Sequence, residues 1–199
     1  MERYTGQLKN EIFHSHTAIR RKKAVDFSTD VLTFDIEVSS GWINQYGNVI
    51  RYHKGHSNEY WNSPIPISLC YIWQFSYNEK VYYGRELRDF VHLLEDLPKD
   101  IEFIIWVHNL SYEFAFLSGI LETSEIFARA PHKPIKAKFK GFKNITFRCS
   151  YMLTRLSLAS WGEQIGLPKM VGDLDYIKLR TPLTPLKTKE LVYASRDCE

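Results

Sequence analysis

Val31-Leu-Thr-Phe-Asp-Ile-Glu-Val38 is the stretch that decides the fold. Its apolar and β-branched residues predict a β-strand, which we expect Ser39-Ser-Gly41 to end. Because side chains alternate across a strand, Asp35 and Glu37 point to one face and the apolar residues between them to the other. Two such carboxylates repel each other unless a cation lies between them, and oxygen ligands favour Mg²⁺ or Mn²⁺. Alone, the pair is equally compatible with two surface acids at a strand end.

A second strand and the helix after it add another carboxylate. Glu102-Phe-Ile-Ile-Trp-Val107 is nearly all apolar, which is typical of a strand buried on both faces of a sheet with helices above and below it. Glu113 follows at the start of a helix, where the helix dipole favours a carboxylate with or without a metal. We expect the inner stripe of this helix to be Phe116, Leu117 and Ile120.

The last acidic position lies on a helix that we expect to begin near Thr188. Tyr193 and Asp197 are spaced i, i+4, so they share one helix face. Asp197 can then join Asp35 and Glu37 around one metal ion, and the Tyr193 phenol can hold a water in line for attack on phosphorus. We therefore predict a two-metal site suited to phosphodiester hydrolysis.

The rest of the chain predicts an α/β domain, with a mixed sheet flanked by helices. Residues 42–64 contain glycine, asparagine and proline and indicate an irregular loop or a hairpin insertion. Thr181-Pro-Leu-Thr-Pro185 is expected to be a rigid connector. The other predicted elements are a hairpin of Ile67–Phe75 with Lys80–Tyr83, a helix with Leu87, Phe90, Val91 and Leu94 that ends before Pro98, and a helix with Leu158, Trp161 and Ile165 that ends at Gly166.

Residues 1–29 show no convincing alternation, so we expect an N-terminal extension before a domain at residues 30–199. Arg20-Arg-Lys-Lys23 is a short basic run within this extension. A solvated, partly ordered segment explains it better than an arm that grips nucleic acid.

Residues 129–148 contain lysines and arginines without a single acid. From Ile135 to Lys140 the lysines alternate with apolar or small residues, so one face of a strand would be wholly basic. Such a face could neutralise phosphates. A solvated edge strand that its lysines protect from aggregation is an equal alternative.

The composition narrows the class of protein. The chain has 199 residues, of which 44% are hydrophobic and 15% aromatic, so it can bury a core and is not disordered. The net charge of +3 is small, so a nucleic-acid surface must come from local clustering. The three cysteines are far apart, which argues against a disulfide framework or a structural zinc site and fits a reducing compartment. We expect neither a membrane span nor a secretory signal.

The order of the motifs D-x-E, H-N-L-x-Y-E and Y-x₃-D resembles the three exonuclease motifs of the DnaQ-like (DEDD, tyrosine subtype) superfamily. Val107-His-Asn-Leu-Ser-Tyr-Glu113 is similar to the second motif of protein-primed family B DNA polymerases of phages. Gly172-Asp-Leu-Asp-Tyr176, followed by Arg180-Thr-Pro182, is similar to the stretch before their third motif. The resemblance covers about residues 31–199 and implies an RNase H-like fold and a 3′→5′ proofreading exonuclease domain.

The resemblance also implies roles for the matching residues. Asp35, Glu37 and Asp197 would bind the tighter of two ions. Asp35 would bridge to the second ion, which Glu113 would help to hold. Further positions match residues that grip the frayed 3′ end of single-stranded DNA: Asn109, Tyr112 and Ser150, with His108 in support.

The sequence departs from the family pattern at two positions. The acid of the second motif is often aspartate, whereas here it is Glu113, which we expect still to serve. The family has a lysine just before the Gly-Asp pair, near the scissile phosphate, and Val171 takes its place here. Lys169 and Lys178 are therefore the candidates for that contact. The motifs of the palm, fingers and thumb are absent from this sequence, so we expect a domain of a longer DNA-directed DNA polymerase.

The expected function is hydrolysis of single-stranded DNA 3′ ends to nucleoside 5′-monophosphates, with two Mg²⁺ or Mn²⁺ ions, during DNA replication in the cytoplasm of a phage-infected cell. The expected partners are the DNA 3′ end, the rest of the polymerase and a terminal priming protein. One alternative is a weak or inactive module that binds DNA or the priming protein, since Asp197 would lie on a frayed helix end. Another is an RNA-trimming DEDD exonuclease, since no residue clearly reads a 2′ hydroxyl.

Overall fold

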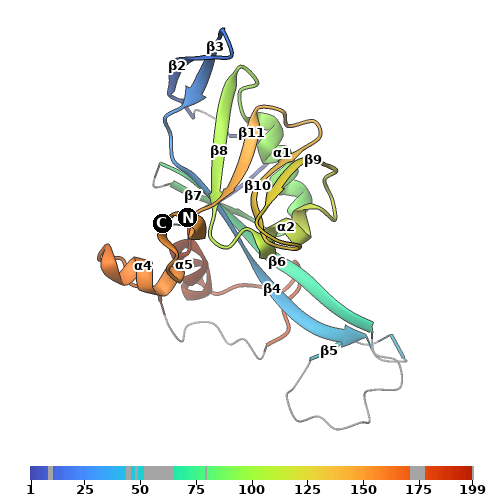
Figure 1. The fold of residues 1–199 in the computed structure, drawn as a ribbon. Coiled ribbons are helices and arrows are strands. Elements are labelled where there is room, and N and C mark those ends of the chain that lie inside the picture. The colour runs from blue at the N-terminus through green and yellow to red at the C-terminus, as the bar shows by residue number, and fades with distance from the viewer. Residues whose placement is uncertain are drawn as a thin grey trace.

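The computed structural model of this chain describes residues 1–8, 11–43, 46–47, 49–51, 65–78, 80–170 and 178–198. They form a mixed sheet flanked by helices, which confirms the predicted α/β class (Figure 1). The strands are β1 (Glu2–Arg3), β2 (Ser15–Arg20), β3 (Lys23–Ser28), β4 (Leu32–Ile43), β5 (Val49–Arg51), β6 (Ile65–Tyr77), β7 (Lys80–Gly84), β8 (Ile101–Val107), β9 (Thr123–Ala128), β10 (Pro134–Phe139) and β11 (Ile145–Cys149). The helices are α1 (Leu87–Asp96), α2 (Ser111–Leu117), α3 (Tyr151–Thr154), α4 (Leu158–Gln164) and α5 (Thr188–Arg196).

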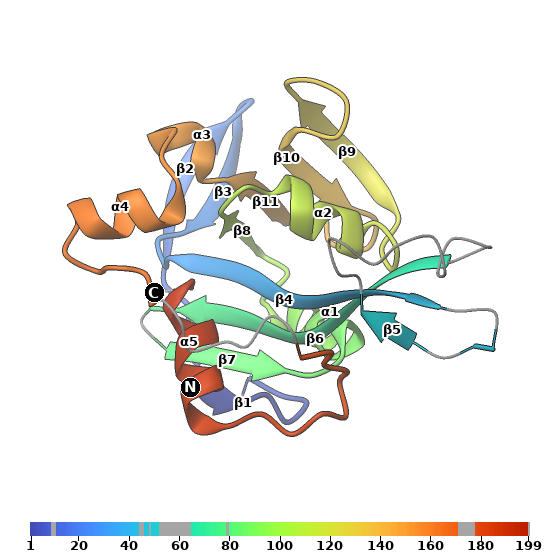
Figure 2. The same ribbon diagram turned by 90° about the horizontal axis from the view of Figure 1, so that it is seen from below.

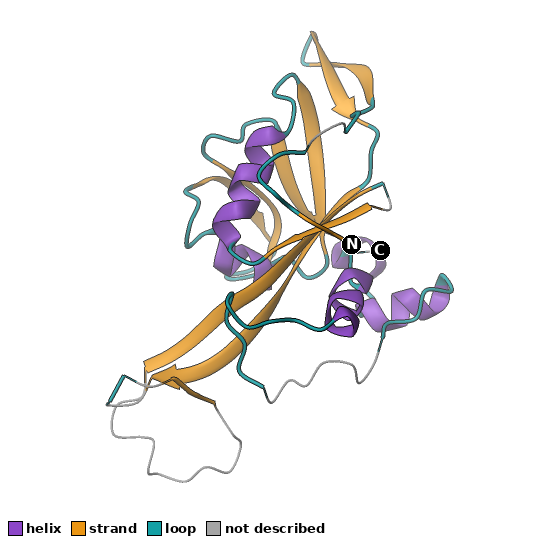
Figure 3. Ribbon diagram, turned by 180° about the vertical axis from the view of Figure 1, so that it is seen from behind, coloured by secondary structure: helices purple, strands orange, loops and turns teal. Residues whose placement is uncertain are grey.

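The sheet runs in the order β1-β7-β6-β4-β8-β11-β10-β9 among the described strands. β4, β8 and β11 are parallel neighbours, whereas β6 and β7 on one side and β10 and β9 on the other pair antiparallel. Figure 3 shows α1 and α2 on one side of the strands and α4 and α5 on the other. The sheet therefore has two distinct faces.

The predicted first strand forms the centre of this arrangement. The side chains of Leu32, Phe34 and Ile36 are buried on the face toward α1, where the Phe34 ring stacks on Phe90 with centroids 4.0 Å apart. The expected end at residues 39–41 is wrong, because β4 continues to Ile43 while it pairs with both β6 and β5. The apolar face supplies the core, and the opposite face is left to polar side chains.

A β-bulge interrupts the pairing of β4 with β6. Glu37 pairs with Ile72 and Val38 with Cys70, so Tyr71 is the extra residue on β6. A bulge bends its strand and increases the local twist. Beyond it, β4 and β6 leave the body of the sheet as a two-stranded arm, with β5 alongside (Figure 1). Glu37 therefore lies where the sheet becomes the arm.

Two predictions about the middle of the chain need correction. β8 is not buried on both faces: every second residue from Ile101 is buried, and Glu102, Ile104 and Trp106 are half-buried. The helix after it ends at Leu117, which is buried, so Ile120 falls in the following turn with 49% of its surface exposed. The prediction failed because the apolar spacing in the sequence continues to Ile120, whereas α2 ends at Leu117.

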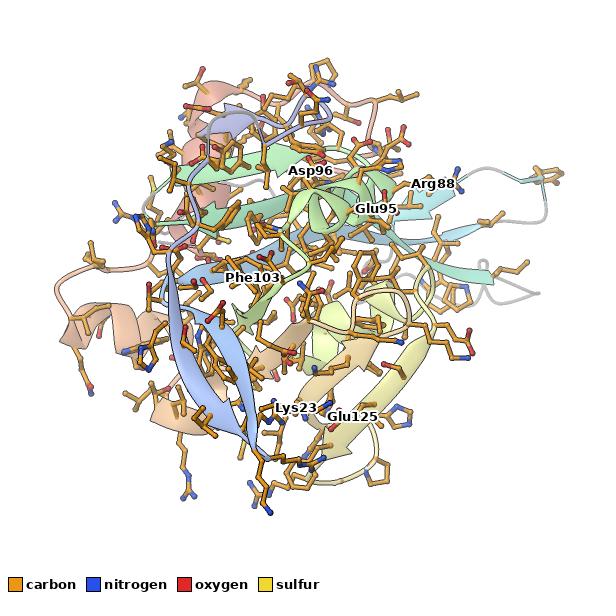
Figure 4. All side chains as sticks on the ribbon, turned by 90° about the horizontal axis from the view of Figure 1, so that it is seen from above. Lys23, Arg88, Glu95, Asp96, Phe103 and Glu125 are labelled. Atoms are coloured by element: carbon orange, nitrogen blue, oxygen red, sulfur yellow. The ribbon has the colours of Figure 1, made fainter. Side chains whose placement is uncertain are left out.

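Much of the predicted extension at residues 1–29 joins the sheet, which the lack of local alternation did not predict. β1 pairs with β7, and β3 pairs with the start of β8. Between them the Tyr4 hydroxyl donates to Asp96 at 2.8 Å, and the Phe13 ring packs edge-on against Phe103. Figure 4 labels Asp96, at the end of α1, and Phe103, on β8. The basic run forms the turn of the β2–β3 hairpin, with Arg21 and Lys22 at positive φ. Long-range pairing, not local alternation, orders this segment.

β10 is an interior strand, between β11 and β9, so the alternative of a basic edge strand is wrong. Its lysines also have acidic neighbours. Lys136 Nζ lies 2.6 Å from Glu125 on β9, and Lys138 Nζ lies 3.6 Å from Glu102 on β8. These pairs weaken the case for this strand as a phosphate-binding face.

The other predicted elements are confirmed where the structure describes them. The β6–β7 hairpin, α1 and α4 lie at the expected places, with Gly166 at positive φ just after α4. Much of residues 42–64 and all of Gly172–Tyr176 fall outside the described residues. The cysteines are free in the described residues, and no described helix is long and apolar enough to cross a membrane.

A buried ion pair fixes the connector and α5 to the sheet. The Arg180 guanidinium donates to Glu190 on α5, and the two side chains are only 3% and 9% exposed. The backbone N–H of Arg180 donates to the Ser39 hydroxyl on β4 at 2.9 Å, and Glu190 also accepts from the N–H of Lys187 at 2.7 Å. The pair thus links β4, the connector and the first turn of α5.

We expect Glu190→Ala to lower the free energy of unfolding by about 3 kcal/mol, because it leaves the buried Arg180 charge without its carboxylate. Urea denaturation measures the change. The matched control is Lys189→Ala on the exposed face of the same helix, which should change stability by less than about 0.5 kcal/mol. Equal stability of the two variants would contradict an anchoring role for the pair.

Candidate functional site

The structure brings three of the predicted ligands together. Asp35 and Glu37 project from the polar face of β4, and Asp197 lies directly after α5, which crosses that face. Each contributes a carboxylate oxygen, and these oxygens lie within 4.8 Å of one another. We call these three residues and Glu113 the acid centre. Figure 2 shows the end of α5 beside β4.

The end of α5 is held to β4. The Thr33 hydroxyl donates to the backbone carbonyl of Cys198 at 2.8 Å, and the Cys198 N–H donates to the carbonyl of Ser195 at 3.0 Å. Cys198 is itself buried, with 3% of its surface exposed. The expectation that Asp197 lies on a frayed helix end is therefore wrong, because the residue after it is tied to the strand that carries Asp35.

Glu113 joins the acid centre from a third element, the helix α2. It lies in the first turn of α2, and only 3% of its surface is exposed. It shares a hydrogen bond with Asp35, and the charge of Glu113 is among the causes that raise the pKa of Asp35. Its Oε2 atom is buried and has no hydrogen-bond partner among the described residues. A buried carboxylate oxygen without a donor calls for a cation.

Three acids of this centre resist ionisation in the absence of a cation: Asp35, Glu37 and Glu113. Burial, followed by the charge of Asp197, raises the pKa of Glu37 to about 7. Burial also raises the pKa of Glu113 to about 8, with the charge of Glu37 adding to it. The pKa of Asp35 rises well above its ordinary value through burial and the charges of Glu113, Glu37 and Asp197. Burial is the largest cause of all three shifts, and the charge of at least one neighbouring acid adds to each of them.

One lysine offsets part of this charge. The Lys169 ammonium lies 2.6 Å from Asp197 Oδ2 and 6.0 Å from the centre of the Tyr193 ring. Burial lowers the pKa of Lys169, but the hydrogen bond and charge of Asp197 outweigh it, so the net pKa is raised. Tyr193 is 4% exposed, on α5 one turn before Asp197. Lys169 is thus the candidate lysine that reaches the acid centre.

The donor set fits a divalent cation. Three carboxylates from two elements converge, a fourth has an orphaned oxygen, and hard oxygen ligands are those that Mg²⁺ and Mn²⁺ prefer. A cation would also relieve the mutual repulsion that raises the pKa values of these acids. The geometry is therefore consistent with the predicted metal centre.

Of the residues expected to hold a nucleic-acid end, His108, Ser150 and Lys169 line one cavity with Asp35 and Asp197. His108 Nδ1 lies 3.2 Å from the Ser150 hydroxyl, and burial lowers the pKa of His108. Asn109 is exposed at a φ of +61°, and Tyr112 is 46% exposed. Burial and the charges of Glu113 and Glu37 raise the pKa of Tyr112 to about 12. Lys178 is also exposed, but it lines none of the hollows described here.

A cavity of about 330 Å³ adjoins the acid centre. Asp35, Asp197 and Lys169 lie at its polar end, and Trp106 of β8 and Trp161 of α4 are among its apolar walls. The ring of Trp161 also lies 6.1 Å from that of His108. The sequence predicts Trp106 on a strand and Trp161 on a helix. It does not predict that both tryptophans line the same cavity.

Gln74 is a neighbour of the acid centre that the sequence analysis missed. It is the cross-strand partner of Asp35 on β6, so the two side chains share a face. Gln74 is fully buried, and neither amide atom has a hydrogen-bond partner among the described residues. Only the register of β4 against β6 reveals it, because nothing in the local sequence distinguishes this glutamine.

Comparisons with known proteins place the fold. No family model and no curated protein matches the sequence. The structure is similar to Phi29 DNA polymerase in an orthorhombic crystal form, and to the same polymerase in complex with single-stranded DNA. For both, the TM-score is 0.60 and the sequence identity 14%, and the match covers 85% of this chain and 29% of the polymerase chain. This chain therefore shares the fold of a part of that polymerase and spans less than a third of its length.

We expect the stability of the metal-free protein to fall as pH rises from about 4.5 to about 8. Glu37 and Glu113 have higher pKa values in the folded chain than in the unfolded one, so the folded state binds more protons across that interval. The loss should amount to several kcal/mol, and Mn²⁺ at the upper pH should reverse it.

Urea denaturation at several pH values, with and without Mn²⁺, measures this dependence. Glu37→Gln should make the slope shallower, whereas Glu95→Gln on the exposed surface of α1 should leave it unchanged. Stability that increases over this interval without metal would contradict the arrangement of the acids.

Proposed function

We propose that this chain is a 3′→5′ exonuclease domain with an RNase H-like fold, which trims single-stranded DNA as the proofreading part of a protein-primed phage-type polymerase. The convergence of Asp35, Glu37 and Asp197 carries the proposal, because it joins residues far apart in the sequence. The fold shared with part of Phi29 DNA polymerase supports a DNA substrate, since two of those structures hold primer-template and single-stranded DNA.

The acid centre would hold two divalent ions, with Asp35, Glu37 and Asp197 around one of them and Asp35 and Glu113 at the other. When bound, such ions activate a water nucleophile and stabilise the charge on the leaving oxygen. The water attacks the phosphorus, the bond from phosphorus to the 3′ oxygen breaks, and that oxygen takes up a proton. The products are a nucleoside 5′-monophosphate and a DNA strand with a new 3′ hydroxyl.

Tyr193 would position the attacking water. It lies one turn before Asp197 on the face of α5 that is buried against the site, so its ring is held firmly. A phenol can both donate and accept a hydrogen bond, which suits it to orient a water along the line of attack. Tyr193 is then a positioning residue, and the acid centre supplies the charge.

Lys169 would meet the scissile phosphate. Without a metal its ammonium neutralises Asp197 at 2.6 Å. Once a cation shares Asp197, the ammonium is free to contact a phosphate oxygen in the same space. Lys169 would thus fill the role that the family assigns to the position of Val171 here.

The terminal nucleotide would bind at the turn between β8 and α2. Tyr112 has an exposed ring on which a base can stack, and the amide of Asn109 is open to solvent. The Ser150 hydroxyl, which contacts His108, can donate to a phosphate or sugar oxygen. These groups would contact the terminal nucleotide of a DNA strand, and they would not contact nucleotides in its interior.

We expect Asp35→Ala with Glu37→Ala to reduce degradation of single-stranded DNA by more than about 10³-fold, because the shared ligands are gone. A time course with 5′-labelled oligonucleotide and Mn²⁺ measures it, and the wild type should give a ladder of shortened products. The double variant should stay folded, since the removed acids repel their neighbours.

The matched control is Glu95→Ala with Glu163→Ala, two exposed acids on α1 and α4 that give the same change in charge. It should degrade DNA as the wild type does. Intact DNA with a retained gel shift in the wild type would favour a binding module. Faster shortening of a matched RNA strand would favour RNA trimming, and degradation by the Asp35/Glu37 variant would refute the assignment of the site.

Tyr193→Phe should lower kcat by about 10²-fold with little change in KM, because it removes the hydroxyl that orients the water and keeps the ring that packs. Single-turnover degradation measures the chemical step. The control is Tyr112→Phe, which retains the ring for stacking and should keep kcat within about threefold of the wild type. Equal kcat values for Tyr193→Phe and the wild type would remove Tyr193 from the mechanism.

A further inference from the structure

A second hollow, a groove of about 680 Å³, leads away from the acid centre. The β8–α2 turn lines one part of it with His108 and Asn109, and the turn between β9 and β10 lines another. His108 and Leu158 also line the cavity that reaches Asp35. The two hollows therefore adjoin, and the groove extends the site toward the β9–β10 turn.

The cationic side chains of this groove form no ion pair with a described residue, unlike two lysines of β10. Lys136 is paired with Glu125 and Lys138 with Glu102, whereas the Arg129 and Lys133 side chains are exposed and bond to no other described residue. Arg129 and Lys133, with His132 between them, form what we call the basic turn. No acid occurs among the lining residues of the groove. The charged side chains that line the groove are therefore cationic, whereas Asp35 and Asp197 line the neighbouring cavity.

The basic turn is shaped by its own backbone. The Arg129 N–H donates to the carbonyl of Lys133, and the Lys133 N–H donates to that of Ala130, each at 3.0 Å. His132 adopts a φ of +58°, in the left-handed region. These two hydrogen bonds close the turn, and the exposed Arg129 and Lys133 side chains project from it. In Figure 2 this turn projects from the sheet beyond α2.

We propose that this groove binds the sugar–phosphate backbone of the nucleotides on the 5′ side of the reacting end, with Arg129 and Lys133 each contacting a phosphate. The inference rests on the proposed function and extends its site. A polyanion is repelled by the acid centre unless cations hold it, so contacts away from the chemistry must supply much of the affinity. Tyr151 in the groove is 39% exposed and offers a ring to a base.

A single strand suits this groove better than an acidic protein segment does. The groove and the cavity of the acid centre share the lining residues His108 and Leu158, so a single strand that passes this shared wall can have phosphates at the basic turn and its terminal phosphodiester at Asp35. An acidic peptide has carboxylates, but it has no terminal phosphodiester that could bind at the acid centre. The shared wall of the two hollows therefore favours a nucleic-acid strand.

The first test measures binding without hydrolysis, in the Asp35→Ala, Glu37→Ala background. Arg129→Ala with Lys133→Ala should weaken binding of a labelled single strand of roughly 12 nucleotides by about tenfold. The slope of log K against log salt should become shallower by about 1.4, since each lost phosphate contact removes about 0.7. Arg129→Lys with Lys133→Arg should keep the slope.

The matched control for charge is Arg88→Ala with Lys189→Ala, on α1 and α5 and outside both hollows, which should keep the affinity and the slope. Thermal melting verifies that all variants fold. An unchanged slope in the Arg129/Lys133 variant would overturn the proposal. So would displacement of the oligonucleotide by a glutamate-rich peptide at equal charge concentration.

The second test uses substrate length in the active protein. The Arg129/Lys133 variant should raise KM for the 12-nucleotide strand about tenfold and leave kcat/KM for a dinucleotide unchanged, because a dinucleotide does not reach the basic turn. Equal losses on both substrates would overturn the groove assignment. Absence of degradation by the wild type would refute the proposed function alone, since the binding test would still decide the groove.

Discussion

The repulsion among the carboxylates of the acid centre is the constraint on which the rest of this structure depends. Burial and neighbouring charge raise the pKa values of Asp35, Glu37 and Glu113, so the fold bears an electrostatic cost in the metal-free state. The fold tolerates this cost because the contacts that stabilise it lie outside the acid centre. β4 buries its other face against α1, and the Arg180–Glu190 pair fixes the start of α5. The strain is confined to one face of one strand, where a cation can relieve it.

The difference between the apolar and the polar face of β4 also explains how α5 is held. A helix that lies across a polar face gains less from burial than one that lies on the core, so specific contacts must hold it. Ile72 and Ala194 provide a small apolar contact, Arg180 binds its first turn, and Thr33 holds the carbonyl of Cys198 at its end. These contacts fix the helix at both ends. Asp197 is thereby placed against Asp35 without any direct attraction between the two acids.

The sequence predicted those parts of the fold and site that depend on local periodicity. The alternation around Asp35 gave its strand, the spacing of Tyr193 and Asp197 gave the last helix, and the apolar run before Glu113 gave a strand, although that strand is not buried on both faces. What failed depended on pairing between distant segments. Residues 1–29 lack local alternation but are ordered by pairing with β7 and β8. Gln74 lies opposite Asp35 only through the register of two strands, and the firm end of α5 depends on one hydrogen bond from Thr33.

The basic segment shows why charge alone was ambiguous. Residues 129–148 contain cations without acids in the sequence, yet β9 and β8 supply Glu125 and Glu102 to β10 across the sheet. Pairing offsets the charges of Lys136 and Lys138 and leaves the turn basic, so Arg129 and Lys133 keep their charge available. That shift matters because a turn can project beyond the sheet, whereas an interior strand cannot. A phosphate-binding surface on this fold should therefore be sought at the ends of strands, where cations have no cross-strand partner.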